Sequence, residues 1–222
     1  MTDQGTTDEG GKALEELARI RGIMDRSQRF LSLSGLSGVA AGVVALATAF
    51  VAHWWLGTLG AGHGSQYAPL LDPMYPDQLL WGRAWTLVML GVASAMLAVA
   101  GAWWFTRRNA LRKGHAMWDA VARRLFIHMI VPLVAGGVFC LALLVHGLPA
   151  LVAPCTLIFY GLALINASKF TLDEVRWLGL SQLLLGLFAM FFPGHGLLCW
   201  ALGFGALHIG YGTFMYLRHE QR

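Results

Sequence analysis

Apolar residues fall in six blocks along the chain, each about 20 residues long, which is the length a helix needs to cross roughly 30 Å of hydrocarbon. A backbone in hydrocarbon must satisfy its own hydrogen bonds, so each block predicts a transmembrane α-helix. The fold class that follows is all-α, a polytopic membrane bundle of six transmembrane helices. The predicted spans are 31–55, 79–105, 125–146, 149–168, 172–192 and 196–217.

The segment before the first span has a different pattern. Residues 12–29 place leucine, isoleucine and methionine side chains near one helical face, which predicts a short amphipathic helix in the cytoplasm. Residues 1–11 are polar and predict a disordered tail. The transmembrane domain then covers 30–217, and 218–222 form a short cytoplasmic tail.

The charges give the spans a direction. Hydrophobic residues make up 57% of the chain and charged residues 13%, which excludes a soluble fold, so the net charge of +4 is no sign of a nucleic-acid partner. All of the 16 Lys and Arg residues except Arg83 lie in the terminal segments or in and beside the second and fourth loops. Because cytoplasmic loops are enriched in Lys and Arg, we expect both termini in the cytoplasm.

Small residues recur at helical spacing in three of the spans. In a bilayer they let helix backbones approach closely, because apolar burial no longer distinguishes one contact from another. We favour packing within one bundle over the alternative, a homodimer seam. The residues are Ser34, Gly38 and Gly42 in the first span, Gly91, Ala95, Ala98 and Ala102 in the second, and Ala201, Gly205 and Gly212 in the sixth.

Histidine and cysteine residues gather in the outer half of the predicted domain. Imidazole and thiolate together suit zinc or copper. None of these residues has the spacing of a metal motif, so we favour interfacial histidines and small packing cysteines over a metal or haem site. The candidates are His53, His146, His195, Cys140, Cys155 and Cys199.

The inner half holds a second polar set, which we interpret as a polar inner mouth. Pro132 removes the N–H that would normally bond the carbonyl of His128, so a local kink or a water is expected there. Arg26 and Arg29 could pair with Asp173 and Glu174. The mouth could be a structural latch, which is the default, a ligand site or a docking surface for a cytoplasmic protein. Its members are Arg26, Arg29, Ser34, His128, Asn166, Lys169, Glu174 and His208.

Signatures of catalysis are missing from the sequence. It has no P-loop, no Rossmann glycine fingerprint and no nucleophile elbow. Asp173 and Glu174 stand at the start of the fifth span, where the helix dipole and a capping box with Thr171 explain them. We therefore expect no enzyme activity, no catalytic residues and no resident cofactor.

Two motifs carry a resemblance to a family. Residues 26–38 fit R-S-x-R-F-x-S-L-S-G-x-S-G, and residues 166–174 fit N-A-S-K-[FY]-T-L-[DE]-E. With these motifs the chain resembles an uncharacterised family of small six-span bacterial inner-membrane proteins. The resemblance implies a location in the bacterial inner (cytoplasmic) membrane and a role closer to accessory or regulatory membrane proteins than to enzymes.

Three functions are compatible with these observations. The favoured one is a non-enzymatic binding, sensory or accessory membrane protein, whose partners are the lipid bilayer and a cytoplasmic protein. The alternatives are a small-solute or metal transporter and a haem or copper redox module. Six short spans would need to dimerise to enclose a transport path, which argues against the transporter.

Overall fold

The structure, a computed structural model, describes residues 16, 34–58, 77–113, 118 and 120–219, and this part of the chain contains helices and no strand. Six helical segments are long and apolar enough to cross a membrane, which confirms the predicted number of spans. The helices are α2 (Gly35–Thr58), α4 (Asp77–Lys113), α5 (Ala120–Val145), α6 (Val152–Ala167), α7 (Asp173–Phe191), α8 (Gly196–Trp200) and α9 (His208–His219). Short 3₁₀ turns η1 (Pro149–Leu151), η2 (Ser168–Phe170) and η3 (Pro193–His195) and a π-helical segment η4 (Ala201–Leu207) join them.

Two elements differ from the sequence prediction. α4 has 37 residues and is therefore about 55 Å long, well beyond the thickness of a bilayer core. Its last turns occupy much of the predicted 106–124 loop, because arginines and alanines there are good helix formers. The sixth span is composite, since α8, η4 and α9 follow one another without a break.

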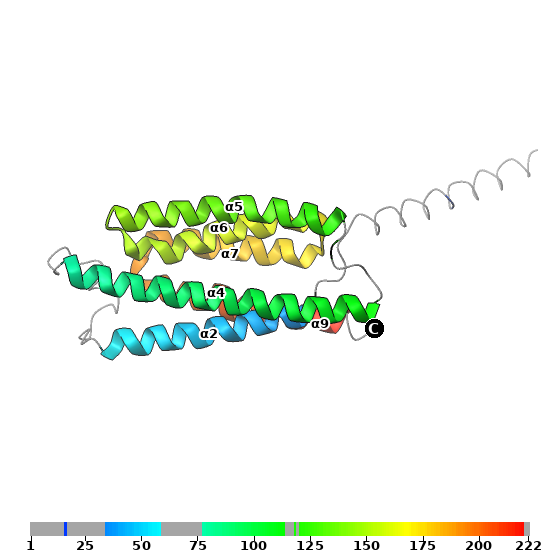
Figure 1. The fold of residues 1–222 in the computed structure, drawn as a ribbon, viewed down its shortest axis with the longest axis horizontal. Coiled ribbons are helices and arrows are strands. Elements are labelled where there is room, and N and C mark those ends of the chain that lie inside the picture. The colour runs from blue at the N-terminus through cyan, green and yellow to red at the C-terminus, as the bar shows by residue number, and fades with distance from the viewer. Residues whose placement is uncertain (1–15, 17–33, 59–76, 114–117, 119, 220–222) are drawn as a thin grey trace, which may run out of the picture.

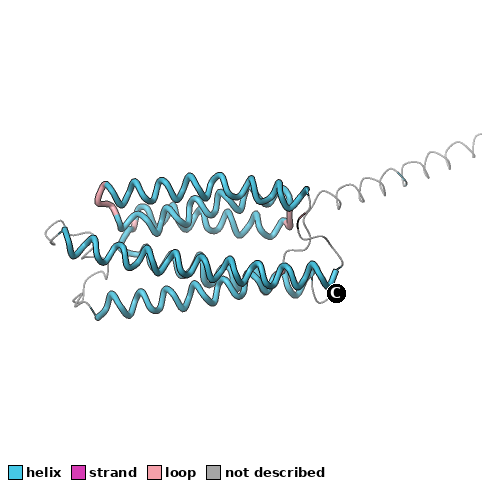
Figure 2. Tube along the Cα trace, in the orientation of Figure 1, coloured by secondary structure: helices cyan, strands magenta, loops and turns pink. Residues whose placement is uncertain are grey.

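The helices form two groups, α5, α6 and α7 on one side and α2, α4 and α9 on the other (Figure 1). α6 lies between α5 and α7, and α2 lies between α4 and the last span; α8, η4 and α9 connect the groups by packing against α6 and α7. Short connections link α5 to α6 at one end and α6 to α7 at the other, so these three helices alternate in direction (Figure 2).

Apart from Arg83, near the start of α4, the basic residues of the described helices lie toward one end of the bundle, which we call the basic end and which lies to the right in Figure 1. They are exposed and come from the ends of α4, α6 and α9 and the starts of α5 and α7. This arrangement agrees with the predicted grouping of charge on one face. The residues are Arg107, Arg108, Arg112, Arg123, Arg124, Lys169, Arg176 and Arg218.

Glycines bring the last span against α2. A Cβ on Gly212 would lie 2.7 Å from both the carbonyl oxygen of Gly35 and the backbone nitrogen of Val39, and a Cβ on Gly42 would lie 2.7 Å from the carbonyl oxygen of Gly205. The small residues of the first and sixth spans thus face each other within one chain, as the favoured packing interpretation predicts. A homodimer stays a prediction.

A second glycine seam joins α6 to α7. A Cβ on Gly161 would lie 2.7 Å from the Gly179 carbonyl oxygen, and a Cβ on Gly179 would lie 2.9 Å from the Gly161 carbonyl oxygen. Gly91 of α4, by contrast, has no atom within 4 Å of a Cβ position, so the stripe predicted on the second span is not used in the same way. Close backbone contact therefore concentrates at two of the helix pairs.

Candidate functional site

Three polar side chains meet inside the bundle, beside the π segment. Tyr160 comes from α6, Gln182 from the middle of α7 and His208 from the first position of α9. Gln182 is fully buried and His208 is 6% exposed. Polar groups at this depth are costly in hydrocarbon unless they find partners, so their convergence marks the candidate site.

The hydrogen bonds define which atoms donate. Nδ1 of His208 lies 3.0 Å from the carbonyl oxygen of Gly203, and Nε2 lies 2.9 Å from the hydroxyl oxygen of Tyr160. Nδ1 also lies 3.3 Å from the Gln182 amide nitrogen, which can only donate; the shorter contact to the Gly203 carbonyl, which can only accept, favours Nδ1 as the donor, and Nε2 then accepts from Tyr160. The amide nitrogen of Gln182 donates to the same carbonyl at 2.8 Å. The network fits a neutral imidazole with both ring nitrogens occupied.

The π segment makes the convergence possible. A π turn carries an extra residue and opens the ordinary helical hydrogen-bond pattern, and such turns are frequent at functional sites. Gly203 lies inside it, and a Cβ there would be 2.5 Å from Oε1 of Gln182. Gln182 can therefore reach η4 only because residue 203 has no side chain. Its Oε1 is the one buried side-chain oxygen or nitrogen of the described residues without a hydrogen-bond partner.

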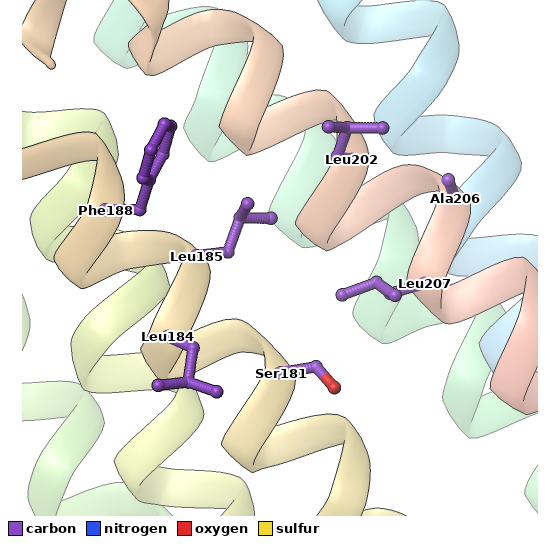
Figure 3. Close-up of a pocket in the computed structure, with 7 residues that line it drawn as sticks. All are labelled: Ser181, Leu184, Leu185, Phe188, Leu202, Ala206 and Leu207. Atoms are coloured by element: carbon purple, nitrogen blue, oxygen red, sulfur yellow. The ribbon is translucent and has the colours of Figure 1, made fainter.

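A groove of about 440 Å³ opens between α7 and η4 on the side that faces away from the core. Figure 3 shows Leu185 and Ser181 directed from α7 toward the stretch from Leu202 to Leu207. Gln182 follows Ser181, and Gly203 follows Leu202, so the Gln182–Gly203 hydrogen bond closes the space behind the groove. The lining is Ser181, Leu184, Leu185, Phe188, Leu202, Ala206 and Leu207.

At the basic end, α7 and α9 meet again through an ion pair. Nη1 of Arg218 lies 3.3 Å from Oε1 of Glu174, and the Glu174 side chain is 11% exposed. The predicted partners Arg26 and Arg29 lie outside the described residues, so that pairing stays a prediction. Leu172, with φ −70° and ψ 143°, is the N-cap of α7, so Thr171 lies one residue before it, and the capping box of Thr171 and Glu174 stays a prediction.

The other predicted members of the inner mouth form separate contacts. The amide of Asn166 donates to the carbonyl of His128 at 2.9 Å, so the carbonyl that Pro132 leaves free is bonded by a side chain rather than by a water. Nζ of Lys169 lies 3.3 Å from Oδ1 of Asn166. The hydroxyl of Ser37 donates to the carbonyl oxygen of the buried Ser34 at 2.5 Å.

The inner mouth is therefore not one site. His208 precedes Arg218 by almost three turns, about 15 Å along the helix axis. The His128–Asn166–Lys169 contacts lie at the α5–α6 side, whereas Ser34 begins the first span beside α9. Sequence position alone placed these residues in the inner half of the domain but could not place them on the same side of the bundle.

The outer histidines and cysteines do not gather in the part of the chain that the structure describes. No three His, Cys, Asp or Glu side chains there are placed to hold a metal ion. Cys155 and Cys199 are buried, and Cys199 packs with Leu157 and Ala189. His53, His146 and His195 are exposed, and Cys140 lies near the carbonyl of Val152 at 4.0 Å.

The sequence interpretation missed two parts of the site. Tyr160 was not singled out, because a tyrosine inside an apolar span is also an ordinary packing residue. Gly203 was missed because hydropathy does not report a π turn. The usable signals were His208, already placed on an interior face, and the run of glycines around it.

Comparisons with protein-family models, with curated proteins and with solved structures give no match for this chain. No function can therefore be transferred from a relative. The functional argument depends on the buried network, on the groove beside it and on the ion pair at the basic end.

Proposed function

We propose that the chain is a non-enzymatic binding and sensory protein of the bacterial inner membrane. In this proposal, occupancy of the groove between α7 and η4 changes the spacing of α7 and the last span. The change reaches the basic end, where a cytoplasmic protein detects it. Both termini then lie in the cytoplasm, as the distribution of Lys and Arg favours.

The observation that carries the proposal is the network of Tyr160, Gln182 and His208. Gln182 and His208 both bond the backbone carbonyl of Gly203, and Tyr160 bonds Nε2 of His208, so the network joins α6, α7 and the last span and engages both ring nitrogens of His208. A histidine held in this way is suited to positioning helices and not to exchanging protons with a substrate. We call this network, together with the Gly203 carbonyl, the joint. Because η4 is π-helical, it has a second, α-helical arrangement that it can adopt.

The joint is connected to the basic end through α7 and α9. Gln182 lies eight residues after Glu174, so the membrane joint and the Glu174–Arg218 ion pair are about 12 Å apart along α7. Both contacts connect the same two segments. A shift of η4 away from α7 would therefore strain or break the ion pair and alter the charge presented at the basic end.

Spin labels test this coupling. In a variant with Cys140, Cys155 and Cys199 replaced by alanine, labels at the exposed positions 177 of α7 and 217 of α9 report the spacing at the basic end. We expect Gln182→Leu to shift or broaden their distance distribution. Ser94→Ala is the matched control, because Ser94 is a buried polar residue on α4, outside the joint. An unchanged distribution in Gln182→Leu would refute the coupling.

The proposed topology has its own test. A reporter enzyme fused after Arg222 should behave as a cytoplasmic reporter. A tag inserted within 58–68 should react with a membrane-impermeant reagent added from outside. A periplasmic signal from the C-terminal fusion would contradict the proposed orientation.

A further inference from the structure

The groove between α7 and η4 contains a hydroxyl group without a partner. Ser181 makes no hydrogen bond to any residue that the structure describes, and its side chain lines the groove on the α7 side (Figure 3). Three threonine hydroxyls of the spans donate to carbonyls of the preceding turn, Thr48 to Val44, Thr86 to Gly82 and Thr156 to Ala153, whereas Ser181 makes no such bond. Ser181 thus has donor capacity left for a molecule in the groove.

The position of Ser181 decides what that molecule can be. It lies about 12 Å from the start of α7, near the middle of a helix of 19 residues. The oxygen atoms of phospholipids lie in the headgroup regions outside the hydrocarbon core. A phospholipid tail could fill the apolar part of the groove but would offer no acceptor to Ser181.

Water and a second protein helix fit less well. A bound water needs two to four polar partners, whereas the groove lining contains a single hydroxyl among six apolar side chains. Helices approach each other in membranes over small residues. Here the rim is formed by the large side chains of Leu184, Phe188 and Leu202, which are all exposed and would hold another backbone away.

We infer that the groove binds a lipid-soluble molecule with a hydrocarbon chain and one hydrogen-bond-accepting carbonyl oxygen, as in a long-chain quinone or ketone. The carbonyl accepts from Ser181, and the chain lies on Leu185, Phe188 and Leu202. The volume of about 440 Å³ is within the usual range for small-molecule sites, roughly 300–1,000 Å³. This inference deepens the proposed function by naming its ligand, and it rests on that function only for the consequence of binding.

The test uses the full chain in vesicles of phosphatidylethanolamine and phosphatidylglycerol. The probe is an alkylbenzoquinone with a diazirine on its chain, and the control probe is the alkylbenzene with the same chain. After photolysis, mass spectrometry maps the labelled residues. We expect quinone labels to concentrate on α7 and η4, and the alkylbenzene to label the exposed faces of α4 and α5 as well.

Variants separate the two parts of the site. Ala206→Phe should fill the groove and abolish its labelling, whereas Ala100→Phe, at an exposed alanine of α4, should not change it. Ser181→Ala should weaken quinone binding about fivefold, as expected from the loss of a hydrogen bond of about 1 kcal/mol, and should leave alkylbenzene binding unchanged. Ser181→Ala removes only one hydroxyl group from the groove lining and should fold. It therefore still tests the site if Ala206→Phe fails to fold.

Three outcomes would overturn the inference. Even labelling of all apolar faces would mean that no groove site exists. Equal binding of the two probes would identify an acyl-chain groove with no role for Ser181. A crosslink between two copies through position 206 would make a second chain the occupant. Groove labelling without a change in the 177–217 distance would support the ligand and refute the coupling.

Discussion

The last transmembrane segment packs against α2 and against α7 in opposite ways. Toward α2, Gly205 and Gly212 meet Gly35, Gly38 and Gly42, so backbone lies on backbone. Toward α7, bulky side chains line an open groove, and the connection is made by side chains: hydrogen bonds, an ion pair and the buried apolar cluster that Met215 shares with Val175 and Leu178. A seam of backbone contacts has one arrangement, whereas a seam of side chains beside a groove can rearrange locally through those side chains.

The largest effects are expected at the glycine seam. Gly212→Ala places a methyl group 2.7 Å from backbone atoms of Gly35 and Val39, which cannot move aside. Overpacking typically costs about 1–3 kcal/mol, and we expect the upper end of that range, measured as loss of thermal stability in detergent.

The matched control is Gly91→Ala on α4, where a Cβ meets nothing within 4 Å. Alanine is favoured over glycine in a helix by about 1 kcal/mol, so this variant should be neutral or stabilised. Equal losses in the two variants would mean that the α2 seam is not the tighter one.

A smaller effect is expected where glycine faces a side chain. Gly203→Ala puts a methyl group against Cδ2 of Leu157 and 2.5 Å from Oε1 of Gln182, and both side chains can move away, Gln182 by giving up the hydrogen bond from its Nε2 to Gly203. We expect a loss of about 1–2 kcal/mol in unfolding free energy. A double-mutant cycle with Gln182→Ala should show that the two losses are not additive. Additive losses would place Gln182 outside the joint.

The loss of unfolding free energy should be smaller again when a hydrogen bond to His208 is removed. Tyr160→Phe removes the hydroxyl that bonds Nε2 of His208 and should cost about 0.6–1.7 kcal/mol, the range measured for hydrogen bonds between membrane helices. Tyr211→Phe is the control, because Tyr211 packs against the apolar cluster of Leu164 and Met215 without a hydroxyl bond in the described structure. A Tyr160 variant as stable as the control would exclude the hydrogen bond.

The sequence predicted the membrane fold because length and hydropathy are sufficient to find a span. It also showed that Pro132 frees the carbonyl of His128, but not that Asn166 would bond it, since that pairing depends on how α5 and α6 face each other. The joint was harder still to predict from the sequence. His208 was recognised as a polar residue of the inner half, and only the three-dimensional arrangement brings it to Gly203 together with Gln182 and Tyr160.

The smallest effect is expected at the ion pair. Arg218 is 59% exposed, so solvent screens its pairing with Glu174, and Glu174→Arg should cost no more than about 1 kcal/mol. Adding Arg218→Glu should restore part of the stability. Further restoration by Arg29→Glu would support the predicted latch between the N-terminal segment and α7, and purely additive losses for both pairs would exclude them.

The most direct test compares the two seams in one experiment. Spin labels at 217 and 177 report the distance from α9 to α7, and labels at 217 and 43 report the distance from α9 to α2; all three positions are exposed. With the alkylbenzoquinone added, we expect the first distribution to shift and the second to stay narrow and unchanged. Equal shifts in both distributions, or a shift confined to the α2 pair, would contradict the account.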